Sequence, residues 1–64
     1  MQPFQQRVVD EKSALDEKIA ALDAFIGTTT FYSLPDDEHM RLSLQLSYMR
    51  NYSLILGMRI EAFT

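Results

Sequence analysis

The chain has 64 residues, 47% of them apolar, with no cysteine and a formal net charge of −3. This length fits a single small domain (residues 1–64), which buries only about 60% of its unfolded surface and is marginal alone. The absence of cysteine excludes disulfides and thiolate metal sites, and the single histidine argues against any other metal site. The acidic balance argues against DNA or RNA binding, so self-association is the expected remedy for a small core.

No apolar run approaches the ~18 residues that span a bilayer. The first residues also lack the basic start and apolar stretch of a secretory signal. The sequence therefore predicts no membrane partner and a cytoplasmic location, which the lack of cysteine also fits.

A first helix is predicted at about residues 4–26. Its apolar residues recur at spacings of three and four, which is the helical period. They are Phe4, Val8, Leu15, Ile19, Leu22 and Ile26. Acidic residues such as Asp16 and Glu17 occupy the remaining faces, where we expect them to point to solvent. Gly27 follows the last apolar residue, as expected for a left-handed residue that ends a helix.

A turn is predicted at residues 27–34. Three consecutive β-branched threonines, Thr28 to Thr30, disfavour continuation of the helix, and threonine hydroxyls favour turns. Phe31 and Leu34 are expected to fold into this end as a hydrophobic plug.

A second helix is predicted at about residues 35–63. Ser33 and Asp36 have the spacing of a capping box, with Ser33 as N-cap. Pro35 suits the first turn, where its missing N–H has no helical partner. His39 lies in an acidic first turn and is expected to be solvated rather than catalytic. The main apolar stripe contains Leu42, Leu46, Met49, Tyr52, Leu56, Ile60 and Phe63.

A second apolar stripe lies beside the first on this helix. Its residues are Leu44, Tyr48, Ile55, Met58 and Ala62. One partner helix covers a stripe only about 100° wide, so the first helix cannot cover both. We therefore predict an all-α fold: a two-helix antiparallel hairpin that assembles into a homo-oligomeric helical bundle. The alternative is a monomer whose exposed face binds a foreign partner.

Lys12 interrupts the apolar stripe of the first helix. The structural interpretation is an ion pair, or a lysine whose aliphatic stem covers apolar surface. The functional interpretation is an anion-binding lysine at a subunit junction. Ser53 and Gly57 are four residues apart on the second helix, a spacing that favours close approach of another backbone.

Arginine and tyrosine alternate along the second helix, which carries Arg41, Arg50 and Arg59. Arginine suits bidentate contact with phosphate, and tyrosine rings suit stacking on bases. The alternative is that Tyr48 and Tyr52 are core or interface residues and that Arg50 pairs with a neighbouring acid. The candidate ligand-binding residues are Arg7, Lys12, Tyr48, Arg50, Tyr52 and Arg59. We predict no catalytic residues and no cofactor, because no nucleophile or phosphate-loop motif is present.

Most of the chain resembles a group of small phage and prophage proteins of unassigned role. The resemblance rests on Gln6 to Lys12, Leu15 to Ile19, Leu34 to Glu38, Arg41-Leu42, Gln45-Leu46, Met49, Tyr52-Ser53, Leu56 and Arg59-Ile60. The chain is also similar in size and expected architecture to phage anti-defence sponges, which hold nucleotide signals between protomers. It departs from the cyclic-dinucleotide sponges in lacking their Tyr-centred N-terminal motif, so no binding residue is transferred.

The resemblance implies a phage-encoded, non-enzymatic protein that sequesters a small anionic nucleotide, of the cyclic oligonucleotide or ADP-ribose type, at subunit interfaces. The alternative is an interaction module that inhibits a host protein through the spare apolar face of the second helix. An enzyme ranks third.

Overall fold

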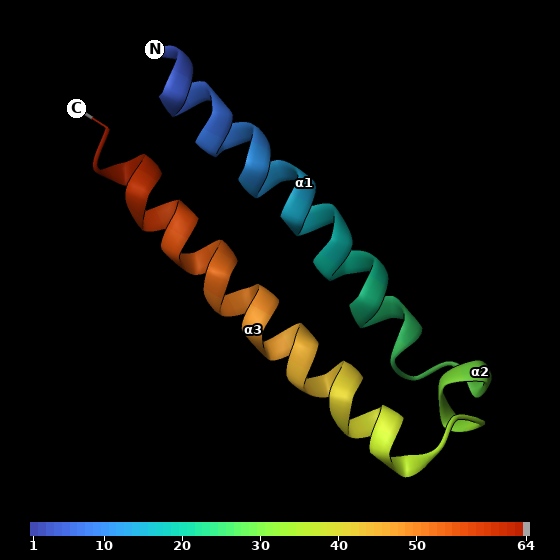
Figure 1. Cartoon of the computed structure of the whole chain (residues 1–64). Coiled ribbons are helices and arrows are strands. Elements are labelled where there is room, and N and C mark those ends of the chain that lie inside the picture. Colours follow the sequence, from blue (N-terminus) through green and yellow to red (C-terminus); the bar gives the residue numbers. More distant parts are fainter. Residues whose placement is uncertain (64) are drawn as a thin grey trace.

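The computed structural model describes residues 1–63, and these residues contain helices but no strand. Helix α1 (Pro3–Phe25) and helix α3 (Asp36–Glu61) lie side by side and antiparallel, joined by the short helix α2 (Thr29–Tyr32). The start of α1 and the end of α3 therefore lie at one end of a rod measuring 46 × 14 × 13 Å, with α2 at the other (Figure 1). The predicted helical hairpin is confirmed; assembly with other copies stays a prediction.

The start of α1 and its end follow from local chemistry. Pro3 occupies the first turn, and the Gln2 amide donates to the Gln5 side chain at 2.8 Å. Gly27 has φ +119°, a value that L side chains rarely adopt, and it follows the C-cap Ile26. The predicted role of Gly27 at the helix end is confirmed, and the predicted bounds 4–26 differ by one residue at each end.

The connection differs from the predicted turn because Thr28 starts a helical turn there. The Thr28 hydroxyl accepts a hydrogen bond from the Phe31 amide at 3.2 Å, so it caps the four-residue α2. The threonines therefore initiate helix at this point, since the first of them supplies the N-cap oxygen. Phe31 is buried and Leu34 half-buried, which confirms the predicted plug.

The predicted capping role of Ser33 is wrong. Pro35 is the N-cap of α3, and the Ser33 hydroxyl instead donates to the Thr30 carbonyl at 2.6 Å. The helix ends at Glu61 rather than Phe63, with Ala62 as C-cap. Asp36 and its acidic neighbours do lie in the first turn, where negative charge is favourable.

His39 is half-buried against α2, which corrects the expectation of a solvated side chain. Its Nε2 lies 2.7 Å from the Phe31 carbonyl, and its ring stacks on Phe31 with centroids 4.5 Å apart. Because a carbonyl can only accept, Nε2 carries the proton in this hydrogen bond. The histidine thus fastens α3 to the connecting helix.

The core is a thin layer between α1 and α3. It is formed by Val8, Leu15 and Leu56, with Ile19, Met49, Ile60 and Phe63 packed against them. Leu56 is the one large side chain of residues 1–63 that is fully buried. Tyr52, predicted in the main stripe, lies at its edge and is 44% exposed. A single pair of helices therefore buries few apolar side chains.

Candidate functional site

A polar cluster crosses the middle of the hairpin. Lys12 reaches from α1 to α3, and its Nζ donates to Asp16 Oδ2 at 2.8 Å and to Ser53 Oγ at 3.1 Å. The Ser53 hydroxyl in turn donates to Asp16 Oδ1. Ser53 is only 7% exposed, so the cluster contains a buried residue of α3. The contacts occupy two of the three ammonium donors of Lys12.

Gly57 makes room for the stem of Lys12. A β-carbon at Gly57 would lie 3.3 Å from Lys12 Cε, closer than ordinary van der Waals contact. The small residues at 53 and 57 therefore accept a lysine side chain from α1, where close backbone approach was expected. Ser53 accepts a hydrogen bond from Lys12, and Gly57 leaves space for the lysine stem.

Asp16 holds this cluster electrostatically. The hydrogen bond from Lys12, and then that from Ser53, lower the pKa of the Asp16 carboxyl below its usual value of 3.8. Asp16 is exposed as expected, with 46% of its side chain accessible, but its carboxylate also contacts Lys12 and Ser53, which was not expected. The signal was present in the sequence, because Asp16 follows Lys12 by four residues, the spacing of an intrahelical ion pair.

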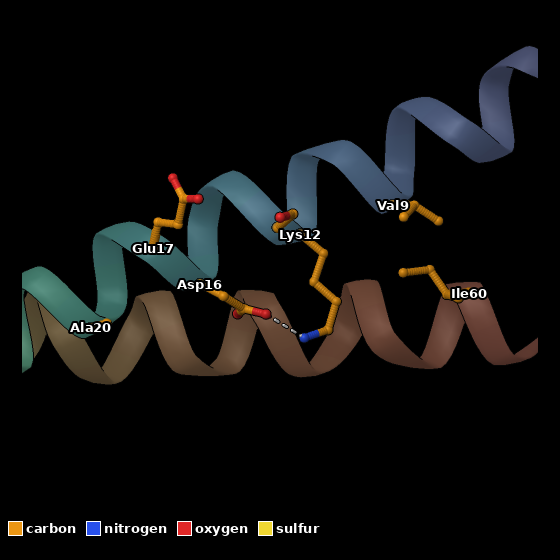
Figure 2. A pocket seen from close by; sticks show the side chains of 7 residues that line it. Val9, Lys12, Asp16, Glu17, Ala20 and Ile60 are labelled. Carbon is orange, nitrogen blue, oxygen red and sulfur yellow. Dashed lines mark hydrogen bonds and ion pairs between the residues drawn. The ribbon is translucent and has the colours of Figure 1, made fainter.

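An open groove of about 500 Å³ runs beside this cluster. Its lining residues are Val9, Lys12, Ser13, Asp16, Glu17, Ala20 and Ile60. Figure 2 shows Lys12 descending to α3 next to Asp16, while Val9 and Ile60 approach each other further along. The polar wall holds two carboxylates and a lysine already paired with one of them, so the groove does not favour an anion.

Arg50 also lies on this side of the hairpin. Its guanidinium donates to Asp23 Oδ1 of α1 at 2.9 Å. The acidic partner expected for Arg50 thus exists within the same chain. We call the side that carries Lys12, Asp16, Asp23 and Arg50 the Lys12 face; it is the face seen in Figure 2.

Arg7 lies on the opposite side, which we call the Arg7 face. Successive residues of a helix are about 100° apart. Val8 is buried against α3 and Val9 lines the groove, so Arg7, one residue before Val8, points the other way. Lys18 follows Arg7 by about three turns and shares its side of α1.

Arg59 and Tyr52 lie on the Arg7 face of α3. Arg59 follows Arg50 by about two and a half turns, which places the two guanidinium groups on opposite sides of the helix. Tyr52, two residues after Arg50, is likewise rotated by about 200° from it. The candidate residues are thus divided: Lys12 and Arg50 on one face, and Arg7, Tyr52 and Arg59 on the other.

The second apolar stripe of α3 is exposed along its whole length. Leu44, Tyr48, Ile55 and Met58 are between 48% and 70% exposed, and Met40 extends the stripe by a further turn. We call these residues, with Ala62, the outer stripe. They point away from α1, which leaves about half or more of each of these large side chains open to solvent. Tyr48 lies where the outer stripe borders the Arg7 face.

These features describe an all-helical hairpin with an exposed apolar stripe, one face on which Lys12 and Arg50 are ion-paired, and an opposite face that carries Arg7, Tyr52 and Arg59. The chain belongs to the Sequestin family, whose model matches residues 2–62. No curated protein and no solved structure matches it. The family name points to sequestration. Within residues 1–63, no helix is both long and apolar enough to cross a membrane.

Proposed function

We propose that this protein is a phage-encoded, non-enzymatic binder that sequesters a small nucleotide immune signal in the cytoplasm of the infected cell. The ligand class is a cyclic oligonucleotide or an ADP-ribose derivative, and its removal would counter host antiviral defence. Membership of the Sequestin family supports the sequestering role. The resemblance to small phage proteins supports the origin and the ligand class.

The outer stripe is the observation that carries the proposal. An exposed apolar strip along a whole helix is typical of a protein interaction site. Covering it with a second copy gives a four-helix bundle, which is the common way for hairpins to complete a core. The binding site then lies where copies meet, because the one groove described above is open and its carboxylates repel anions.

Isothermal titration calorimetry against cyclic oligonucleotides and ADP-ribose derivatives tests the proposal. The expected result is saturable heat for one ligand class, at a stoichiometry of one ligand per fixed number of chains. Recovery of the ligand unchanged after denaturation of the protein would distinguish sequestration from turnover. Well-folded protein that gives no heat with any member of the panel would contradict it.

The second candidate is an inhibitor of a host protein. The same outer stripe supports it, because a foreign helix could occupy the surface as well as a second copy could. A stable monomer in analytical ultracentrifugation, together with one host protein that co-purifies at fixed ratio, is the expected result for this candidate. A self-assembled particle without a host partner would contradict it.

A further inference from the structure

The cations of the chain fall into two groups. Lys12 and Arg50 pair with carboxylates on the Lys12 face, and Arg41 pairs with Glu38 at 2.7 Å. The other cations are Arg7, Lys18 and Arg59, and within residues 1–63 none of them has an ion-pair partner. All of the latter lie on the Arg7 face. The cations of the Lys12 face are therefore all ion-paired, whereas on the Arg7 face only Arg41, near the start of α3, is paired.

The sequence around Arg59 explains why it is unpaired. An intrahelical partner would have to lie three or four residues away. The residues at those positions are Ile55, Leu56, Ala62 and Phe63, all of them apolar. No hydrogen bond ties the Arg59 guanidinium to another residue of the described chain. The Arg59 guanidinium is therefore available to an anion from outside the hairpin.

Arg7 does have acidic residues within reach along α1, yet it pairs with neither. The Asp10 carboxylate accepts a hydrogen bond from Gln6 at 2.9 Å. Glu11 follows Arg7 by four residues but makes no ion pair with it. Arg7 and Arg59 are both exposed, so an incoming anion has access to their guanidinium groups.

The hairpin brings Arg7 and Arg59 together from opposite ends of the sequence. The rings of Phe4 and Phe63 meet with centroids 6.2 Å apart, which fixes the register of the open end. In that register Arg7 and Arg59 are within about 5 Å of each other along the axis. Neighbouring helix axes are about 8–10 Å apart, so two long side chains on one face can converge on one anion. Tyr52, with an exposed ring, lies about two turns from Arg59 on the same face.

We propose that Arg7 and Arg59 form a phosphate clamp on the Arg7 face, with Tyr52 as a stacking surface beside it. Guanidinium groups bind phosphate through paired, charge-assisted hydrogen bonds, and a tyrosine face accepts a nucleobase. The site takes a phosphate ester with an attached aromatic ring. It rests on the proposed function and assigns the ligand to this face, away from the groove beside Lys12. Tyr48 at the border connects the clamp to the outer stripe, where a second copy would pack.

NMR titration of the arginine-labelled protein with inorganic pyrophosphate tests the clamp directly. The Nε–H resonances of Arg7 and Arg59 are expected to shift together and to saturate, while that of Arg41 stays in place because Glu38 and Asp37 already bind it. Shifts centred on Lys12 and Asp16, or no saturable shift, would overturn the assignment.

Variants separate a specific clamp from general charge attraction. Arg7→Gln and Arg59→Gln are each expected to weaken pyrophosphate binding about tenfold or more. Arg41→Gln is the matched control, because it removes the same charge from an exposed arginine and should leave affinity within about twofold. Equal loss in all the variants would mean general charge attraction and would overturn the clamp. An acidic protein segment that binds the same arginines in place of phosphate would also overturn it.

The two proposals fail in distinguishable ways. If a nucleotide binds and Arg7→Gln and Arg59→Gln leave its affinity unchanged, the clamp is wrong and the proposed function stands. If pyrophosphate binds at Arg7 and Arg59 while every nucleotide of the panel fails, the clamp stands and the proposed function is wrong.

Discussion

Lys12 shows how a charged residue can serve a core without being buried in it. Its stem passes over Gly57, and its ammonium joins Asp16 to the buried hydroxyl of Ser53. A lysine in an apolar stripe thus fixes how α1 sits against α3, because the hydrogen bonds form only when these residues are level.

Gly57→Ala tests whether the lysine stem requires the glycine. Alanine in a helix interior is favoured over glycine by about 1 kcal/mol, but here its β-carbon presses on Lys12 Cε. We expect Gly57→Ala to raise the unfolding free energy less in the wild type than in a Lys12→Ala background. Urea denaturation of the four proteins in this double-mutant cycle measures the difference. Equal gains in both backgrounds would show that the contact has no energetic effect.

The pH dependence of stability follows from Asp16. Its pKa is lower in the folded chain than in the unfolded one, so its ionised form stabilises the fold above the unfolded pKa. That contribution is lost as the pH falls through the lower, folded pKa. We expect Asp16→Asn to flatten the decline in unfolding free energy below about pH 4.

Glu17→Gln, next to Asp16 on the exposed side of α1, is the control for this pH profile. It leaves the contacts among Lys12, Asp16 and Ser53 in place, so the acid decline assigned to Asp16 should remain. A profile that responds equally to both substitutions would contradict the role assigned to Asp16.

Single residues were predictable only where their partners are close in the sequence. The role of Gly27 followed from its place after the apolar stripe. The partner of Lys12 was within reach, since Asp16 is four residues away. By contrast, Ser53 and Asp23 could not be matched with Lys12 and Arg50, because the register between helices fixes those pairs and no local pattern encodes it.

At the scale of the elements, the helices and their order followed from apolar periodicity, whereas the connection did not. Three threonines in a row have low helix propensity, but Thr28 acts as a cap rather than as a breaker. His39 was misplaced for a related reason. Its neighbours in the sequence are acidic, but its contact is with Phe31, eight residues earlier, across the turn.

His39→Leu tests the fastening between α2 and α3. Leucine keeps apolar contact with Phe31 but leaves its carbonyl without the histidine donor, so we expect a loss of about 1 kcal/mol in unfolding free energy. Amide hydrogen exchange should rise in α2 and in the first turn of α3. Asp36→Asn is the control, because its carboxylate lies 3.8 Å from the other ring nitrogen and the bond to Phe31 stays intact. If His39→Leu leaves exchange in α2 unchanged, the histidine does not fasten it.

At the scale of the molecule, the outer stripe predicts that copies of the chain associate through α3. Ile55→Asp places a charge in its centre and removes a side chain whose burial is worth about 1.5–3 kcal/mol. We expect association to weaken about tenfold to hundredfold per buried copy, and the chain to shift towards monomer in analytical ultracentrifugation. Ala24→Asp, which adds the same charge to the exposed side of α1, should leave the assembly unchanged. An unaltered particle with Ile55→Asp would show that copies do not meet at this stripe.

The stripe was predictable from the sequence because two apolar series on one helix exceed what one neighbour can cover. The division of the candidate ligand-binding residues between two faces was not predictable from the sequence. Tyr48, Arg50 and Tyr52 are close in the sequence, but helix geometry turns Arg50 away from the tyrosines. Arg7 and Arg59 are far apart in the sequence, and only the antiparallel pairing brings them to one face.

The start of α1 and the end of α3 lie at the same end of the rod, which has a mechanical consequence. A force applied between them pulls α1 and α3 apart like a zipper, so each layer of contacts breaks in turn, beginning with Phe4 and Phe63. Resistance to such a pull is set by the weakest layer rather than by the sum of all layers. An unfoldase that holds one end while the other is anchored would therefore open the isolated hairpin easily, and packing of other copies along α3 would have to supply the resistance.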